Sequence, residues 1–164
     1  MRRKLYLTLF LTFLLTATLD AVAAILLNHG VPAERIARYI ASGVYGKRAF
    51  TVPGPTMIIY GVMFHYMIAY AFTAVWFISY PALKRAGLNK WIIGFGYGVV
   101  TWLVMTFMVL PISNIIKSKA PMTLYGIGTG IGTLVICIGL PTALIAAWYY
   151  GGAGKPARRK VRKN

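Results

Sequence analysis

The chain has 164 residues, of which 59% are hydrophobic and only 12% are charged. A soluble domain carries about 25% charged residues, so the composition excludes an ordinary soluble fold. The formal net charge is +16, from 18 Lys and Arg residues against two acids; because the basic residues lie between long apolar blocks, we expect a membrane protein and no nucleic-acid binding.

Four apolar blocks follow one another along the chain, at residues 5–27, 56–80, 91–112 and 122–150. Each is longer than the ~20 residues that a helix needs to cross the hydrocarbon core, and none alternates like a barrel strand. Backbone groups find no water in lipid, so such blocks must be helical. The sequence therefore predicts an all-α integral membrane fold, with one domain over residues 1–150 that contains four transmembrane helices.

The first block has two interpretations. Basic residues, an apolar run and then Ala21-Val22-Ala23 resemble a signal peptide with its cleavage site. The apolar run continues to Leu27, however, and is long enough to span a bilayer. We therefore expect a first transmembrane helix, with cleavage as the open alternative that N-terminal sequencing of the mature protein decides.

A mixed segment connects the first two blocks. Pro32 suits the first turn of a helix, where Glu34 would lie near the positive end of the helix dipole. Small and apolar residues recur at helical spacing, so residues 32–43 are predicted to form a short amphipathic helix at the outer membrane interface. Gly43 and Gly46 are expected to end it. The expected role is a lid over the bundle, and the alternative is a gate or a partner-docking element.

Two ionisable residues stand inside apolar blocks, Asp20 in the first and His65 in the second. Such groups are costly in lipid and face a bundle interior or a cavity. Both lie roughly 12–14 Å below the outer boundary at 1.5 Å per residue, and small residues flank each of them. We therefore predict a hydrogen-bonded intramembrane pair. It either fixes the register of two helices and does nothing else, or holds and relays a proton.

Glycines mark the expected helix contacts. Pairs four residues apart occur in the third and fourth blocks, and this spacing lets helices approach closely. No strand precedes these glycines and no G-x-G-x-x-G is complete, which disfavours a nucleotide site. The predicted packing glycines are Gly61, Gly94, Gly98, Gly126 and Gly130, with a further pair at Gly128 and Gly132.

Prolines interrupt two of the blocks. Pro111 lies near the outer end of the third block and Pro141 lies inside the fourth. A proline inside a helix removes a backbone hydrogen bond, so each is predicted to kink its helix. We expect plain kinks that improve packing; the alternative is a broken helix that lines a binding site, as in transporters.

Basic residues set the expected orientation. With the N-terminus inside, twelve Lys and Arg residues flank the inner ends of the spans and six flank the outer ends. Both termini are therefore predicted to be cytoplasmic. Residues 151–164 are predicted to form a disordered tail that binds anionic lipid headgroups. Its basic residues are Lys155, Arg158, Arg159, Lys160, Arg162 and Lys163.

The sequence lacks the common catalytic motifs. It contains no H-E-x-x-H, no G-x-S-x-G, no P-loop and no paired His ligands for haem. Its one cysteine, Cys137, has no partner for an intramolecular disulfide and no metal-ligand spacing. We therefore expect no enzymatic activity, no cofactor and no metal.

Several stretches resemble a known family, at residues 40–50, 61–81, 109–114 and 138–142. They are similar to a family of small four-helix bacterial inner-membrane proteins that is distantly YagU-like. The resemblance covers most of the chain. It implies a bacterial inner membrane and a four-helix architecture in which residues 41–50 and His65 belong to a shared core design, and it supplies no catalytic residues.

Two functions remain open from the sequence. The expected one is a non-enzymatic inner-membrane component with a structural, stress-related or partner-binding role; its partners would be membrane lipids, a second copy of the chain or another membrane protein. The alternative is a small oligomeric transporter or proton-linked channel that uses Asp20 and His65. A polar cavity that reaches both side chains would favour the alternative, and dry packing would favour the first.

Overall fold

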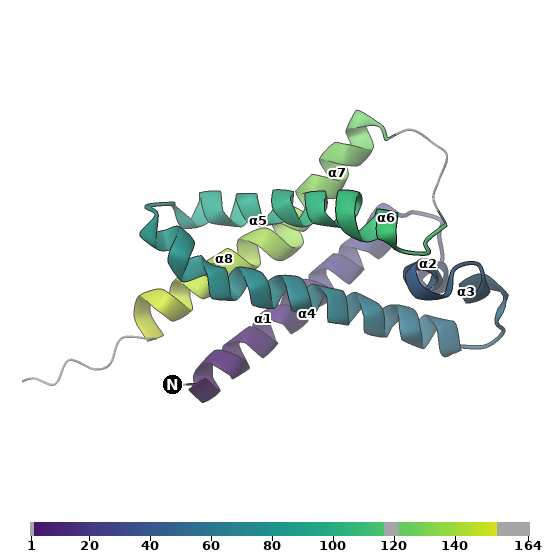
Figure 1. The fold of residues 1–164 in the computed structure, drawn as a ribbon, viewed down its shortest axis with the longest axis horizontal. Helices are drawn as coiled ribbons and strands as arrows, with labels where there is room; N and C mark the ends of the chain where they lie inside the picture. Colours follow the sequence, from purple (N-terminus) through teal and green to yellow (C-terminus); the bar gives the residue numbers. More distant parts are fainter. Residues whose placement is uncertain (1, 117–121, 154–164) are drawn as a thin grey trace, which may run out of the picture.

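The structure is a computed structural model that describes residues 2–116 and 122–153 (Figure 1). Every regular element within these residues is a helix. Four helical stretches are long and apolar enough to cross a membrane: Arg3–Leu27, Thr56–Arg85, Lys90–Ile112 and Leu124–Gly151. They coincide with the four predicted blocks, so the prediction of an all-helical fold with four helices of spanning length is confirmed.

Two of these stretches are single helices, and the other two contain a π-helical turn. The single helices are α1 (Arg2–Leu27) and α4 (Thr56–Arg85). The third stretch consists of α5 (Lys90–Val104), the π-helical turn η1 (Met105–Val109) and α6 (Leu110–Ile112). The fourth consists of α7 (Leu124–Leu134), η2 (Val135–Gly139), α8 (Leu140–Trp148) and the π-helical end η3 (Tyr149–Ala153). Two shorter helices, α2 (Ala33–Tyr45) and α3 (Arg48–Thr51), connect α1 to α4.

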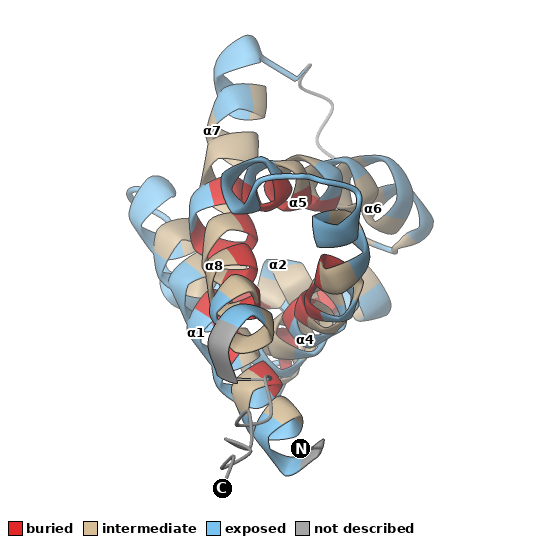
Figure 2. Ribbon diagram, turned by 90° about the vertical axis from the view of Figure 1, so that its left-hand side faces the viewer, coloured by how far each residue is buried: buried red, intermediate tan, exposed pale blue. Residues whose placement is uncertain are grey.

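The bundle has two distinct ends (Figure 1). The start of α1, the α4–α5 turn and the end of α8 lie together at one end, which we call the terminal end. The helices α2, α3 and α6 lie at the opposite end, which we call the α2 end. Viewed along the bundle, buried residues face the interior between α1, α4, α5 and α8, and exposed residues face outward (Figure 2). Many outward side chains are large and apolar, for example Leu11, Val75 and Phe95, as lipid contact requires.

Aromatic side chains fill the terminal half of the bundle. Trp76 of α4 stacks on Tyr97 of α5 with ring centroids 4.5 Å apart. The Tyr97 hydroxyl donates to the carbonyl of Trp76 at 2.5 Å, and the indole N–H of Trp76 donates to the Thr101 hydroxyl at 2.9 Å. Each polar tip of these rings thus has a partner, as a buried aromatic needs in a dry interior. This reciprocal contact joins α4 to α5.

Glycines allow α5 to approach the fourth stretch closely. A Cβ at Gly98 would overlap the backbone of Val135, and a Cβ at Gly139 would overlap the carbonyl of Gly94. A Cβ at Gly94 would lie 3.0 Å from the Cα of Leu140. The missing side chains therefore let two backbones meet, which is how helices associate where apolar burial gives no advantage over lipid.

The other predicted glycines behave differently from one another. A Cβ at Gly130 would lie 2.6 Å from the indole nitrogen of Trp102, so this glycine makes room for a ring. Within the described residues, the nearest neighbour of a Cβ at Gly126 is Thr123 of its own helix cap, at 3.3 Å. We expected Gly126 to pack against another helix. It does not do so among the described residues, because the first turn of α7 projects from the bundle (Figure 1). The further pair, Gly128 and Gly132, faces open space among the described residues.

Both predicted kinks coincide with a widened helical turn. The turn η1 precedes Pro111 and the turn η2 precedes Pro141. In each case the residue before the proline donates its N–H five residues back, Leu110 to Met105 and Leu140 to Val135. The extra residue in the turn thus redistributes the hydrogen bonds around a residue that has no N–H.

Two helix ends differ from the sequence expectation. The helix α2 continues past Gly43 to Tyr45 and ends at Gly46, which has a positive φ of 56°. The helix α4 continues past Pro81 to Arg85, because a proline in the last turns removes only one backbone bond. The expected outer basic residues Lys117 and Lys119, and the six basic residues of the predicted tail, lie outside the described residues.

Candidate functional site

Polar side chains join α1 to α4 at the level of residues 16–18. Thr16 donates to the Phe13 carbonyl at 3.1 Å, so its oxygen accepts from Thr73 of α4, also at 3.1 Å. In the same way, Thr18 donates to the α1 backbone and accepts from the hydroxyl of Tyr66 at 3.0 Å. Ala17, between the two threonines, is fully buried. The small residue brings the helices together, and the hydroxyls fix their register.

His65 of α4 bonds to this same part of α1. Its Nε2 lies 2.9 Å from the carbonyl oxygen of Ala17. A carbonyl only accepts, so Nε2 carries the proton and donates. The bond therefore holds the imidazole through Nε2, and Nδ1 is its other ring nitrogen.

The hydrogen bond predicted between Asp20 and His65 is not formed. In the described part of the chain, the Asp20 carboxylate makes neither a hydrogen bond nor an ion pair, and His65 bonds instead to Ala17, three residues before Asp20 on the same helix. The imidazole reaches the backbone because the small Ala17 side chain leaves it accessible. The two side chains are nonetheless close enough for their charges to interact.

Asp20 and His65 line one half-open cavity of about 630 Å³, which we call the main cavity. Its walls come from α1, α2, α4, η1 and the segment that follows α6. A volume of this size is typical of small-molecule sites. Most of the lining side chains are apolar, among them Ile25, Ile40 and Val62. The second acid of the chain, Glu34 of α2, lines the same cavity.

The helix α2 forms one wall of the main cavity and packs directly on α4. A Cβ at Gly61 of α4 would overlap the carbonyl of Ala37, so the two backbones are in contact. Ala41 and Ser42 of α2 are fully buried. The predicted amphipathic helix is therefore more than an interfacial helix, because Ala37, Ala41 and Ser42 are buried against the rest of the protein.

Arg38 holds the connection between α2 and α4 in place. Its guanidinium donates to the carbonyls of Ala49 and Val52, both at 2.9 Å, and to that of Gly54 at 2.7 Å. These three carbonyls lie at the end of α3 and in the connection to α4, where no following helical turn supplies N–H donors. The charged guanidinium donates to all three. From the sequence, Arg38 is one of the six basic residues that flank the outer ends of the spans, and it lies off the apolar face of the predicted amphipathic helix. Its structural role has no signal in the sequence, because the carbonyls that it binds are backbone atoms.

The end of α6 is joined to the end of α2. The backbone N–H of Asn114 donates to the carbonyl of Gly43 at 2.8 Å, and its side-chain amide donates to that of Val44 at 3.1 Å. Together with Gly61 and Arg38, these bonds attach α2 to α4 and to the segment after α6. The lid expected from the sequence is therefore fixed at three places.

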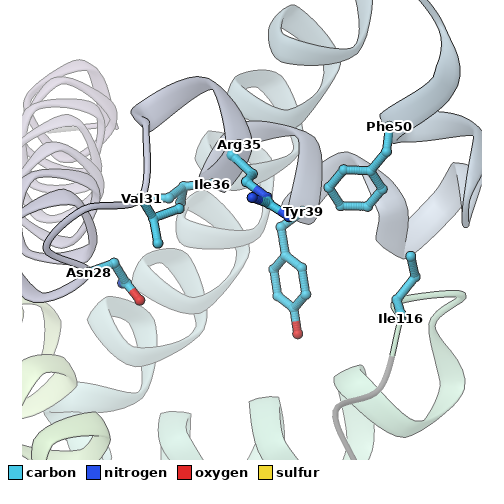
Figure 3. Close-up of a pocket in the computed structure, with 7 residues that line it drawn as sticks. All are labelled: Asn28, Val31, Arg35, Ile36, Tyr39, Phe50 and Ile116. Atoms are coloured by element: carbon cyan, nitrogen blue, oxygen red, sulfur yellow. The ribbon is translucent and has the colours of Figure 1, made fainter.

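A second pocket of about 610 Å³, the outer pocket, lies at the α2 end (Figure 3). Its lining residues come from the α1–α2 connection, from α2 and α3, and from the segment after α6. Arg35 lines this pocket and not the main cavity. Ile36 and Tyr39 line both, so α2 separates two adjoining spaces.

Titratable side chains from several elements surround Asp20. No group of three His, Cys, Asp or Glu side chains that could hold a metal ion occurs among residues 2–116 and 122–153. The titratable groups around Asp20 come from three elements: His65 and Tyr66 from α4, Glu34 and Tyr39 from α2, and Cys137 from η2.

Glu34 is the cavity residue that the sequence analysis did not recognise. It was assigned to the helix dipole, which its place in the first turn of α2 also supports. A signal was present, because Glu34 is one of only two acids in the chain.

Comparisons with protein-family models, with curated proteins and with solved structures found no match to this chain.

Proposed function

We propose that the chain is a multi-pass membrane protein that takes a small solute into the main cavity and transfers a proton at Asp20 and His65. One observation carries this proposal: the acid and the imidazole that interrupt the apolar blocks both line a single cavity of about 630 Å³. Dry packing of the two side chains would have argued against the proposal. Most of the wall is apolar, unlike the polar cavity that the sequence analysis named as the sign of a transporter, so the proposal depends on Asp20 and His65 themselves.

The chemistry of the pair explains how a proton and a solute would be linked. In a low dielectric, a carboxylate without a hydrogen-bond partner is stabilised by protonation or by a nearby positive charge. A neutral imidazole can accept a proton at its second ring nitrogen, and His65 bonds to Ala17, three residues before Asp20 on α1. A proton and a solute would therefore influence one another in the cavity, and that is the basis of proton-linked transport.

Localisation and orientation form part of the same proposal. The terminal end carries Arg3 and Lys4 as well as Lys84, Arg85 and Lys90 at the α4–α5 turn. The positive-inside rule then favours a cytoplasmic terminal end and an outer α2 end. The resemblance noted from the sequence supports the bacterial inner membrane.

Proton flux into proteoliposomes tests the proposal. Vesicles that contain the full chain and an internal pH-sensitive dye are given an inward proton gradient, first alone and then with a panel of small solutes. We expect the parent protein to accelerate acidification over empty vesicles, and Asp20→Asn to abolish the acceleration. Thr129→Val, a polar change on α7 away from the cavity, is the matched control and should leave it unchanged. No acceleration by the parent, or equal acceleration by Asp20→Asn, contradicts the proposal.

One observation favours the structural role that the sequence analysis expected. His65 bonds to the backbone of α1, which a residue that only fixes helix register would also do. If that is its whole role, His65→Gln should lower thermal stability, while Asp20→Asn should change neither stability nor flux. Mass measurement in detergent would then show whether the chain acts with a second copy or with another membrane protein.

A further inference from the structure

The two acids of the chain, Asp20 and Glu34, line the same cavity. The sequence has 18 Lys and Arg residues and only two acids, so a basic partner is available for either acid almost anywhere. Yet both Asp20 and Glu34 line the main cavity, and neither forms an ion pair within the described residues. They come from different helices, Asp20 from α1 and Glu34 from α2. The negative charge of the protein is thus concentrated in one cavity.

The main cavity also excludes the positive side chains that surround it in the sequence. No Lys or Arg is among the described residues that line it. Arg35, the direct neighbour of Glu34, lines the outer pocket instead, and the guanidinium of Arg38 is occupied by carbonyls of the α3 segment. Among the described residues, an anionic solute would therefore meet two acidic side chains and no Lys or Arg, so charge complementarity favours a cation.

The remaining lining defines which kind of cation fits. Apolar side chains make up most of the wall, so a fully hydrated inorganic cation would lose its water without replacement. Phe64 and Tyr66 are among the lining residues, and the Phe64 ring also stacks with Tyr45 and Tyr60. Aromatic rings attract organic cations through their π faces. Met67 and Met105 contribute flexible, polarisable side chains that adapt to different shapes. A volume of about 630 Å³ suits a drug-sized molecule.

We infer that the main cavity binds a monovalent organic cation with apolar substituents, held by Asp20 and Glu34 and by the aromatic rings of Phe64 and Tyr66. The inference rests on the proposed function because it takes this cavity as the solute site. It adds the class of solute. A bound cation stabilises the Asp20 carboxylate as a proton does, so solute and proton compete for the same group.

A pair of probes with the same shape and opposite charge tests the inference. Tetraphenylphosphonium and tetraphenylborate are titrated separately onto the full chain in nanodiscs, with empty nanodiscs as the correction for partition into lipid. We expect saturable binding of tetraphenylphosphonium only. Asp20→Asn should weaken its binding by at least about tenfold, and Glu34→Gln by a smaller factor because Glu34 is more exposed to solvent screening. Arg35→Gln, which changes the outer pocket, should not weaken it.

Three results would overturn the inference. These are equal binding of the two probes, tetraphenylphosphonium binding that survives Asp20→Asn, and a co-purified lipid in the cavity, seen by native mass spectrometry, that neither probe displaces. Thermal stability of each variant shows whether a loss of binding reflects loss of fold. Proton flux that depends on Asp20, without tetraphenylphosphonium binding, would leave the proposed function standing and remove only the solute class. Tetraphenylphosphonium binding without proton flux would leave the solute class standing and remove the proposed proton transfer.

Discussion

The contact between Gly61 and Ala37 offers the sharpest test of how the lid is attached. In Gly61→Ala, the new methyl group would meet the carbonyl oxygen, the carbonyl carbon and the Cα of Ala37. All three are backbone atoms, which cannot rotate away as the end of a long side chain could. The helix α2 must therefore move as a unit, or α4 must bend. Either response also changes the main cavity, because Ala37 is part of its wall.

Overpacking of this kind costs about 1–3 kcal/mol in a closely packed interior. For a chain of this size, each kcal/mol lowers the unfolding temperature by roughly 2–4 °C, so Gly61→Ala should unfold several degrees below the parent. The matched control is Gly128→Ala in α7, where an added Cβ has no described atom within 4 Å. There the substitution should be neutral or stabilising by up to about 1 kcal/mol, because alanine is the better helix former.

Thermal unfolding of the purified protein in detergent measures both variants, with the four tryptophans as the fluorescent reporter. We expect the two glycine substitutions to shift the unfolding temperature in opposite directions, or the control not at all. A Gly61→Ala variant as stable as the parent, with unchanged solute binding, would refute the direct backbone contact between α2 and α4.

Three further predictions use the same stability assay with a control from within the chain. Gly98→Ala should destabilise the protein by about 1–3 kcal/mol, because its Cβ would overlap the Val135 backbone. Gly96→Ala should not destabilise it, because a Cβ there has no described atom within 4 Å. Equal effects of the two substitutions would argue against the α5–η2 contact. Arg38→Gln should cost about 1.5–3 kcal/mol and expose the 47–55 segment to proteolysis, because a charged donor to three carbonyls is lost, while Arg35→Gln at the rim of the outer pocket should leave both unchanged. Tyr97→Phe should cost about 0.5–1.5 kcal/mol through the lost bond to the Trp76 carbonyl, and a similar loss in exposed Tyr125→Phe would show that the hydroxyl itself is not the cause.

The sequence predicted the spans well because their signal is local. Twenty or more consecutive apolar residues in lipid leave the backbone no alternative to a helix. The placement of Asp20 and His65 on inward faces also followed from local pattern, since small residues flank both. The predicted hydrogen bond between Asp20 and His65 was wrong, because the imidazole can bond either to a carboxylate or to a backbone carbonyl. Only the relative position of α1 and α4 decides that choice.

Contacts that involve backbone atoms could not be predicted from the sequence. The three carbonyls that bind Arg38 carry no residue-specific signal, and the same holds for the contact between Gly61 and Ala37. The convergence of Glu34 with Asp20 required α2 to fold back over α1 and α4, and an amphipathic pattern alone predicts a helix but not its partner. The glycine pattern likewise could not separate Gly98, which meets a neighbouring backbone, from Gly126, which lies on a projecting turn.

The central claim is that Asp20 and His65 lie in a solute cavity and not against lipid, and cysteine accessibility tests it most directly. The single native cysteine is first removed as Cys137→Ser, after which Ala24→Cys places a thiol on the wall of the main cavity and Val22→Cys places one on the exposed face of the same helix. Proteoliposomes are treated with a membrane-impermeant cationic thiol reagent. The account predicts that the cysteine at position 24 reacts and is protected by tetraphenylphosphonium, while the cysteine at position 22 stays unreactive in lipid. Equal reactivity at both positions, or none at position 24, would contradict it.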